Sequence, residues 1–412
     1  MVKNLISIML VMIALGVFTV VCWQLAIPAK PDEDLLIPNE IANDFTPAVN
    51  QNRQPARILL DKAQLIASAK AGGDYLVRLQ KADGSFHYYY DAARDKFETR
   101  TYNIVRHAGT AYSLFELYAA TKEARYLEAA NRACRFLKTR FRPAQKKNAI
   151  YVLDFDNKAK LGANALALLA LAEQMEVDAK SANREDARKL ANMILTLQNP
   201  DGSFESYHSI KGDEPDGNVS LYYPGEALLA LIRFYKFDDD KKWLEAARRG
   251  ADYLQQAQSK TKPLPPDAWF IQALEALNKL LFNQKYFDHA LAIADSLIAT
   301  QYSEEDSVYY AGAFSPGIPR VTPTASRAEG LLAAYRMAEL VKDWRTTTIA
   351  LSLRACARFQ ISQQFTADTD AHLPNPQRAL GGFRESIDDF HVRIDYVQHN
   401  ISALLGIAET LY

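Results

Sequence analysis

The sequence predicts an all-α protein in which six helical hairpins close into a ring, an (α/α)6 toroid. Two kinds of helical segment alternate from about residue 58 to the end of the chain. One kind has a single apolar stripe and a charged remainder, which is typical of a helix that buries one side only. The other kind is apolar nearly all round, which is typical of a helix buried on every side. This order, outer helix then inner helix, occurs six times.

The amphipathic segments are predicted to form the outer layer of the ring. Three of them open alike, with a basic residue, an aromatic residue and then alanine within the next turn, at Arg125, Lys242 and Lys285. A phrase repeated in this way indicates a repeated structural unit. We expect outer helices over residues 58–80, 123–140, 183–198, 240–258, 284–301 and 342–363.

The apolar segments, rich in Ala and Leu, are predicted to form the inner layer. We expect inner helices over residues 104–120, 160–176, 222–236, 267–282, 324–341 and 395–411. An open α-solenoid is the alternative architecture. Closure is favoured because the inner segments are strongly apolar and the connectors are very unequal. The long connectors all lead into inner helices, so they gather on one face, where a site is usually built.

A turn phrase ends two of the outer segments. Gln-x-x-Asp-Gly-Ser-Phe occurs at residues 80–86 and again at residues 198–204, and Asp-Gly supplies a tight turn. Together with the six hairpins, this phrase resembles the (α/α)6-toroid superfamilies. These include six-hairpin glycosidases, polysaccharide lyases, sugar epimerases and terpenoid-cyclase-like proteins. The resemblance covers about residues 58–412 and implies the fold more specifically than the activity.

The phrase is also similar to the glutamine–aromatic repeat of terpene cyclases. However, the acidic signature expected of a cyclase is not in place. The acidic run at residues 238–240 begins an outer helix, where carboxylates are favoured by the helix dipole in any case.

The first 29 residues differ from the rest of the chain. Residues 5–23 are almost wholly apolar and uncharged, and such a segment is long enough to cross a bilayer as a helix. We expect an uncleaved signal anchor or transmembrane helix over residues 1–29 and a linker over residues 30–56. The toroid domain, residues 57–412, is then expected outside the cytoplasm, in the periplasm or the extracellular space.

The composition excludes some partners and cofactors. The chain has 412 residues and a formal net charge of −1, so nothing suggests a nucleic-acid partner. No phosphate loop and no dinucleotide glycine fingerprint is present. We therefore expect no cofactor and no metal ion.

The predicted inner helices begin with polar residues and turn apolar one turn later. In a closed ring these N-termini converge, and their dipoles favour a polar or anionic ligand there. The polar starts are Arg106 with His107, Lys160 with Asn164, Glu226, Asp267 with Trp269, Arg327 with Glu329, and Asp395 with His399.

Catalytic roles are expected for four of these residues. A hydrolase would use Glu226 as the acid and Asp395 as its partner, because glycoside hydrolysis needs two carboxylates. A lyase or epimerase would use His107 and His399 for proton transfer, with cations to neutralise a uronate. Residues expected to bind the substrate are Tyr102, Asn103, Arg106, Tyr222, Trp269, Arg327, Glu329, Tyr396 and Asn400.

The function predicted from these features is that of a membrane-anchored, exported protein that binds and processes a glycan, by hydrolysis, lyase cleavage or epimerisation. A non-catalytic toroid that holds a polymer or protein partner is the second hypothesis. A toroid that processes terpenoids or lipids is the third, and the polar starts of the inner helices argue against it.

Overall fold

The computed structural model describes residues 60–146, 148–210, 220–314 and 316–412. The expected anchor (residues 1–29) and linker (residues 30–56) lie outside the described residues. Within the described part of the chain, no helix is both long enough and apolar enough to cross a bilayer.

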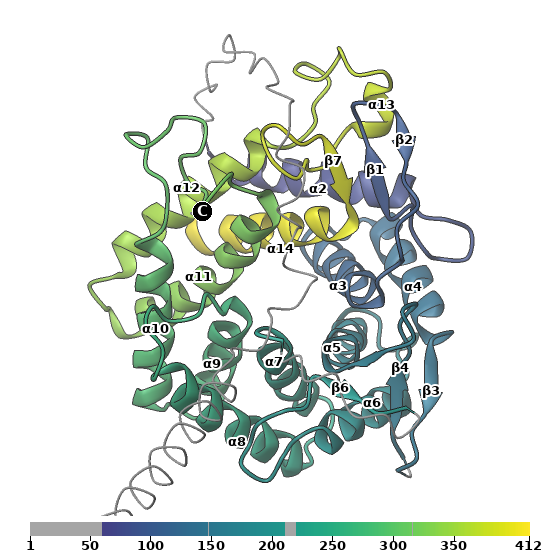
Figure 1. Ribbon diagram of the computed structural model, residues 1–412, viewed down its shortest axis with the longest axis vertical. Coiled ribbons are helices and arrows are strands. Elements are labelled where there is room, and N and C mark those ends of the chain that lie inside the picture. The colour runs from purple at the N-terminus through teal and green to yellow at the C-terminus, as the bar shows by residue number, and fades with distance from the viewer. Residues whose placement is uncertain (1–59, 147, 211–219, 315) are drawn as a thin grey trace, which may run out of the picture.

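Six outer and six inner helices form the ring, with the inner helices around its centre (Figure 1). Each lies where the sequence predicts it, with ends shifted by four residues or fewer. The outer helices are α2 (Lys62–Arg78), α4 (Ala124–Lys138), α6 (Arg184–Thr196), α8 (Lys241–Gln258), α10 (Gln284–Ile298) and α12 (Thr346–Ser362). The inner helices are α3 (Ile104–Thr121), α5 (Leu161–Val177), α7 (Tyr223–Tyr235), α9 (Ala268–Leu280), α11 (Val321–Val341) and α14 (Ile394–Leu411).

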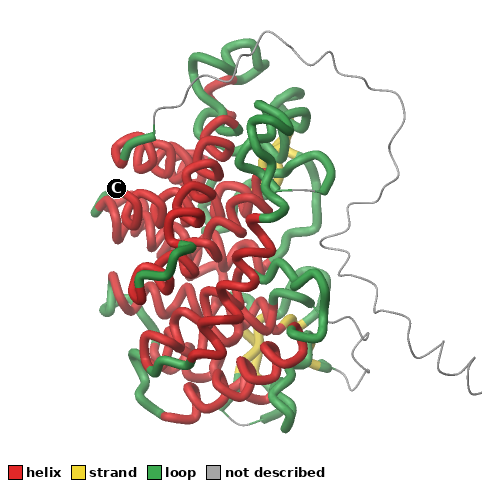
Figure 2. Tube along the Cα trace, turned by 90° about the vertical axis from the view of Figure 1, so that its left-hand side faces the viewer, coloured by secondary structure: helices red, strands yellow, loops and turns green. Residues whose placement is uncertain are grey.

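The long connectors lie together on one face of the ring, as Figure 2 shows. They also contain short strands and one short helix, α13 (Pro376–Ala379), which the prediction of an all-α fold did not include. Strands β2 (Lys96–Phe97), β1 (Tyr89–Asp91) and β7 (His391–Arg393) form an antiparallel sheet in that order. Two further strand pairs join β3 (Phe141–Pro143) to β4 (Ile150–Val152) and β5 (Ala159–Lys160) to β6 (Tyr207–His208).

The glutamine of the turn phrase joins one outer helix to the next around the ring. The side-chain amide of Gln80, after α2, donates to the carbonyl of Ala129 in α4 at 2.9 Å. Gln198, Gln301 and Gln364 donate in the same way to the carbonyls of Ala246, Ser352 and Ser68. Because Ser68 belongs to α2, the last outer helix is bonded to the first. The ring is therefore closed, and an open solenoid is excluded.

The inner layer closes at the same place. Helix α14 packs against α2, α3 and α11. The Ser402 hydroxyl donates to the Glu116 carboxylate at 2.5 Å, which links α14 to α3. A Cβ at Gly109 would lie only 2.5 Å from the side-chain oxygen of Gln398, so glycine at this position lets the first and last inner helices approach closely.

Candidate functional site

Ion pairs, a ring contact and electrostatic interactions link side chains from the N-terminal halves of several inner helices, on the face that carries the long connectors. These side chains are Arg106 of α3, Glu226 of α7, Trp269 of α9, Glu329 of α11, and Asp395 and His399 of α14. All six were predicted as site residues from the sequence. Acidic groups such as Glu226 and Asp395 are favoured here because the N-terminal ends of helices are electropositive.

Asp395 is held by two arginines. Arg393, just before α14, makes a bidentate contact through Nε at 2.6 Å and Nη2 at 2.9 Å. Arg106 Nε lies 3.3 Å from the same carboxylate, and its Nη1 donates to the Tyr88 hydroxyl at 2.8 Å. Burial alone would raise the pKa of Asp395, but Arg393 and Arg106 lower it to about 2. This carboxylate is therefore ionised at any physiological pH.

Glu226 has the opposite character. Its side chain is buried, and its Oε2 has no hydrogen-bond partner among the residues that the structure describes. Burial raises its pKa to about 8, against the opposing effect of a positive charge on His399. A carboxyl group with such a pKa carries its proton at neutral pH, so Glu226 is suited to act as a general acid.

His399 is oriented by a carboxylate from the neighbouring helix. Its Nδ1 lies 3.0 Å from Glu329 Oε1, and the edge of Trp269 faces its ring with 6.3 Å between centroids. Burial would lower the pKa of His399, but Glu329 and Asp395 raise it overall. Since Nδ1–H donates to Glu329, the proton on Nε2 is the one that can be exchanged.

Glu226 and His399 together provide two groups that exchange protons near neutral pH. Each affects the pKa of the other. Trp269, whose ring contacts His399, is itself buried. Such an arrangement can add a proton at one atom of a bound molecule and remove one from another.

His107 does not belong to this cluster, and its predicted catalytic role needs correction. The side chain is completely buried between α3 and α4. Its Nε2–H donates to the carbonyl of Ala133 at 2.9 Å, and its Nδ1 accepts from the Tyr102 hydroxyl at 2.8 Å. Burial lowers its pKa to about 4. His107 is therefore a neutral packing residue that joins two helices, and it does not face His399.

Four of the residues predicted to bind substrate have structural partners instead. The Tyr102 hydroxyl accepts from the backbone N–H of Phe86. Asn103 caps α3 by accepting from the Arg106 N–H at 3.1 Å. Tyr396 is buried and donates to the Glu385 carboxylate. Asn400 is also buried, and its amide donates to the Tyr396 carbonyl at 2.6 Å. The predicted contacts of these side chains with a ligand are therefore not supported.

Tyr222 and Arg327 lie at the edge of the site and are both partly exposed. They are close enough for each to shift the pKa of the other. The Arg327 guanidinium also lies over the ring of Phe314, 5.2 Å from its centroid. These two residues remain available to contact a ligand beside Glu226.

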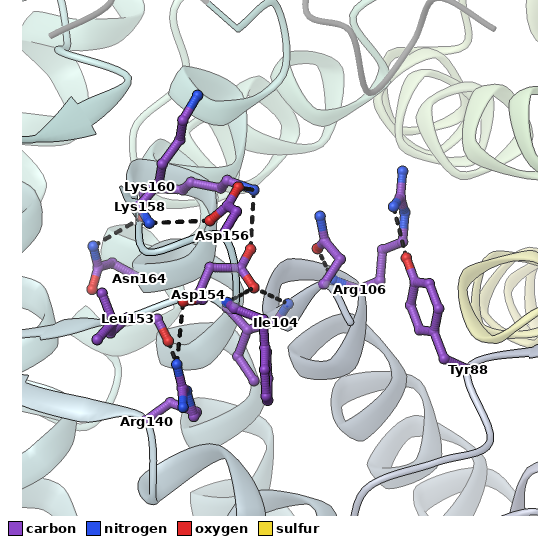
Figure 3. A network of polar contacts seen from close by, with 12 residues as sticks. Tyr88, Ile104, Arg106, Arg140, Leu153, Asp154, Asp156, Lys158, Lys160 and Asn164 are labelled. Atoms are coloured by element: carbon purple, nitrogen blue, oxygen red, sulfur yellow. Dashed lines mark hydrogen bonds and ion pairs between the residues drawn. The ribbon is translucent and has the colours of Figure 1, made fainter. Parts of the chain in front are cut away.

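Lys160, the polar residue at the start of α5, binds the connector that leads into this helix. Figure 3 shows the Asp154 carboxylate between the Ile104 N–H, which it accepts at 2.9 Å, and the Lys160 ammonium, 3.0 Å away. Lys160 also pairs with Asp156 at 2.7 Å. Because Lys160 lies between the two carboxylates, they are held within the connector. Asp154 also anchors the start of α3 through the Ile104 N–H.

No protein-family model and no curated protein sequence matches this chain. Several solved structures do match. D-mannose isomerase aligns with a TM-score of 0.62 and 15% identity, over 85% of this chain and 98% of its own. Cellobiose 2-epimerase from Bacillus thermoamylovorans aligns with a TM-score of 0.65 and 13% identity, over 84% and 99%. The α-1,6-mannanase from Salegentibacter sp. aligns with a TM-score of 0.62 and 12% identity, over 84% and 99%.

Each of these neighbours is matched over almost its whole length, so each shares the ring of helical hairpins. The chain is an (α/α)6 toroid. At identities this low, the likeness establishes the fold and leaves the reaction to be argued from the site.

Two residues of the toroid's site were missed by sequence reasoning. Arg393 and Tyr88 both come from the β1–β7 connector sheet or its edge, and both bind groups of the Arg106–Asp395 pair. The only available signal was the position of Arg393 two residues before Asp395. Tyr88 gave no signal, because its contact depends on closure of the ring.

Proposed function

We propose that this toroid is a carbohydrate-active enzyme that processes a glycan or sugar through proton transfer by Glu226 and His399. The observation that carries the proposal is the buried Glu226 carboxyl, protonated at neutral pH and without a hydrogen-bond partner among the described residues, beside the oriented His399. A buried polar atom without a partner is costly in free energy unless a ligand supplies one. The carbohydrate-processing neighbours with the same fold support the substrate class.

Among the reactions considered, epimerisation or isomerisation fits the site best. In its neutral form His399 takes the proton from a carbon next to the sugar carbonyl, while Glu226 gives its proton to the carbonyl oxygen. An enediol results. His399 then returns its proton to carbon, either to the neighbouring carbon in isomerisation or, after the intermediate turns, to the opposite face of the same carbon in epimerisation. Glu226 takes back a proton from the hydroxyl that becomes the carbonyl of the product, so both groups regain their starting states. This sequence needs one acid and one base, and the site has both.

Hydrolysis is the second candidate, because the raised pKa of Glu226 also suits the acid of a glycosidase. The predicted partner, Asp395, is ionised as that reaction requires. However, Arg393 binds both of its oxygens, so the carboxylate is not free to activate water or to attack a sugar.

The two other hypotheses, a toroid that acts on terpenoids or lipids and a non-catalytic scaffold, predict different sites. A toroid acting on terpenoids or lipids predicts an apolar set of side chains, whereas Arg106, Glu226, Glu329, Asp395 and His399 are ionisable. A non-catalytic scaffold predicts no pair of groups that titrate near neutrality. As part of the same proposal, we infer from residues 1–29 that the toroid is tethered to a membrane and exported.

The test is incubation in D2O with reducing sugars, mannose and cellobiose, and separately with α-1,6-linked mannotetraose. Deuterium on a sugar carbon, seen by NMR without chain cleavage, is the expected result. The rate should have a bell-shaped pH profile whose alkaline limb lies at about pH 8, set by Glu226. Glu226→Gln and His399→Asn should each reduce the rate by about 100-fold or more, and the exposed His372→Ala should not.

New reducing ends without deuterium on carbon would establish hydrolysis instead. Binding of the sugars with neither product would establish the non-catalytic scaffold. Unchanged turnover in Glu226→Gln would refute the proposed acid whatever the reaction.

A further inference from the structure

A second cluster of ionisable side chains lies outside the proposed reaction site, on the β2–β1–β7 sheet. Asp91 ends β1 and is paired in the ladder with His391, which opens β7. Glu98 follows β2 directly. One ligand atom from each of these three residues lies within 4.8 Å of the others. The first and last hairpins of the ring thus supply the three groups.

The geometry around the imidazole of His391 is specific. Nε2 lies 3.7 Å from Asp91 Oδ2 and 3.6 Å from Glu98 Oε1. On the other side of the ring, Nδ1 lies 2.5 Å from Asp389 Oδ1. Tyr89 stacks on the ring with 4.9 Å between centroids, which fixes the ring plane.

The position of Nε2 is electrostatically unfavourable without a cation. The short contact to Asp389 takes the proton on Nδ1, so Nε2 of the neutral ring presents a lone pair to two carboxylates. Nε2 is buried and, within the described ranges, has no hydrogen-bond partner. A proton on Nε2 would be attracted by both carboxylates but would complete no hydrogen bond, because 3.6 Å and 3.7 Å are too long. A larger cation between the three groups would satisfy all of them.

We propose that Asp91, Glu98 and His391 bind a divalent metal ion of the zinc type. Zinc binds imidazole nitrogen and carboxylate oxygen at about 2.0–2.2 Å, so two ligands of a tetrahedral ion lie about 3.4 Å apart. The separations of 3.6 Å and 3.7 Å need to close by only a few tenths of an ångström. Water would complete the coordination.

The surroundings of His391 support this assignment. A ligating histidine almost always donates its other N–H to a carboxylate or carbonyl, which fixes the tautomer and makes the ligand more basic. Asp389 is that carboxylate here. An imidazole ligand disfavours Ca²⁺ and Mg²⁺, which prefer oxygen alone.

Two arginines are the competing cations near the carboxylates. Arg94 lies 3.6 Å from Asp91 Oδ2, but its side chain is largely exposed. Arg100 binds the other oxygen of Glu98, Oε2, at 3.3 Å. Within the described residues, neither arginine forms a hydrogen bond with Nε2, and both side chains are exposed enough to turn into solvent. The metal would therefore displace no buried partner.

The consequence is a metal clamp across the seam of the ring. β7 continues into Arg393, whose guanidinium holds Asp395, and Tyr89 of β1 is paired with Arg393. An ion bound to this sheet would hold the first and last hairpins together beside the proposed reaction site. This inference does not depend on the reaction proposed above.

The test uses the purified full chain, stripped with EDTA and titrated with ZnCl2 by calorimetry and by thermal melting. We expect one Zn²⁺ per chain and a rise in Tm of several degrees. His391→Ala and Glu98→Gln should each weaken binding by about tenfold or more, and the exposed His372→Ala should leave it unchanged. Glu98→Gln is the decisive variant if His391→Ala fails to fold, because Glu98 lies in a partly exposed connector.

Equal Zn²⁺ affinity in all of these variants would overturn the proposal, as would the absence of binding to the wild type. Binding of CaCl2 without ZnCl2 would overturn the assigned metal class. If Tm depends on pH through His391 and not on any metal, the cluster is a protonated histidine among carboxylates, and the proposal is wrong.

Discussion

Arg106 Nε and Asp395 Oδ2 lie 3.3 Å apart, although one residue begins the first inner helix and the other the last. This ion pair therefore joins the seam of the ring to the proposed reaction site. Arg393 binds the same carboxylate through two further bonds. Removal of Asp395 leaves Arg393 without its carboxylate, whereas removal of Arg106 leaves Asp395 still paired. The two changes should therefore differ in their effect on the free energy of unfolding.

Asp395→Asn should destabilise the fold more than Arg106→Ala does. The first change leaves the mostly buried Arg393 without its carboxylate, which costs about 3–5 kcal/mol. The second leaves Asp395 still paired with Arg393, so we expect a loss of about 1–2 kcal/mol. Urea denaturation at pH 7 measures both, with the exposed Arg135→Ala as the neutral control.

The same pair has a defined dependence on pH. The pKa of Asp395 is lowered to about 2 from 3.8, so its contribution is complete above pH 3.8 and is lost as the pH falls through 2. The stability difference between the wild type and Asp395→Asn should shrink over that window. If Arg106→Ala proves the more damaging change, Arg106 is the structural tie and Asp395 is not.

Glu226→Gln should stabilise the protein at alkaline pH. Burial raises the pKa of Glu226 from 4.5 to about 8, so its contribution is present below pH 4.5 and is lost as the pH rises through 8. Glutamine does not titrate. We expect little difference at pH 5 and a gain on the order of 2–4 kcal/mol at pH 8.5, measured by urea denaturation at both pH values.

The second buried acid near Glu226 is the internal control. Burial raises the pKa of Asp267 to about 7, so Asp267 also lowers the free energy of unfolding as the pH rises. This effect is the same in the wild type and in Glu226→Gln, and it cancels when their stabilities are compared. A Glu226→Gln variant that is less stable than the wild type at pH 8.5 would show that the folded protein favours the ionised carboxylate, which would contradict a raised pKa of Glu226.

His107→Ala should affect stability and leave catalysis to His399. The change removes two hydrogen bonds and leaves a cavity between α3 and α4, so we expect a loss of about 2–4 kcal/mol. The pH profile of any turnover should keep its shape, because a buried group with a pKa of about 4 does not titrate near neutrality. His399→Ala should instead remove turnover, with a smaller loss of stability. Loss of turnover in His107→Ala without loss of stability would restore its predicted catalytic role.

The helices could be predicted from the sequence because their signals are local. Helix α5 is buried on all sides, and its sequence is apolar on all sides. Helix α8 buries one stripe, and its sequence shows one stripe. Capping residues such as Asn103 and Asp240 mark the starts. None of these features requires knowledge of a distant part of the chain.

The site could be predicted only in part, because side-chain direction changes by about 100° with each residue of a helix. Arg106 and His107 are adjacent, so only Arg106 points toward α14, and His107 points toward α4. Asp395 and His399 lie four residues apart on one face and do meet the site. Tyr396 and Asn400 lie on another face and do not.

Contacts made by the connectors could not be predicted at all. Tyr88 and Arg393 reach the site, and Asp91 meets His391, only because β1 pairs with β7 across the seam. These pairings join opposite ends of the sequence and have no local pattern. The expectation of no metal ion was made without knowledge of these pairings and stays untested.

Removal of the N-terminal segment tests the predicted domain boundary. A chain that begins at Gln54 should remain soluble, with helical circular dichroism and a Tm close to that of the full chain. The reason is that the ring is closed by residues from α2 onward, through Ser68 and Gln364. Aggregation of the shortened chain would contradict a simple anchor and linker, whereas membrane fractionation of the full and shortened chains tests the tether itself.

Gly381→Ala should open the seam between the last and the first outer helices, and Gly317→Ala is its matched control. Both glycines have a left-handed backbone, with φ of +83° and +82°, so both substitutions carry a similar strain of about 1 kcal/mol. A Cβ at Gly381 would also lie 2.1 Å from the Ala71 carbonyl oxygen in α2, whereas nothing lies within 4 Å of a Cβ at Gly317. The backbone of α2 would have to move, and the nearby bonds of Gln364 to Ser68 and to Gly381 would weaken.

We therefore expect Gly381→Ala to lower the free energy of unfolding by at least about 2 kcal/mol more than the control. Equal effects of the two substitutions would mean that the seam adapts without loss, and close packing of the connector at Gly381 against α2 would then not be what holds the ring shut.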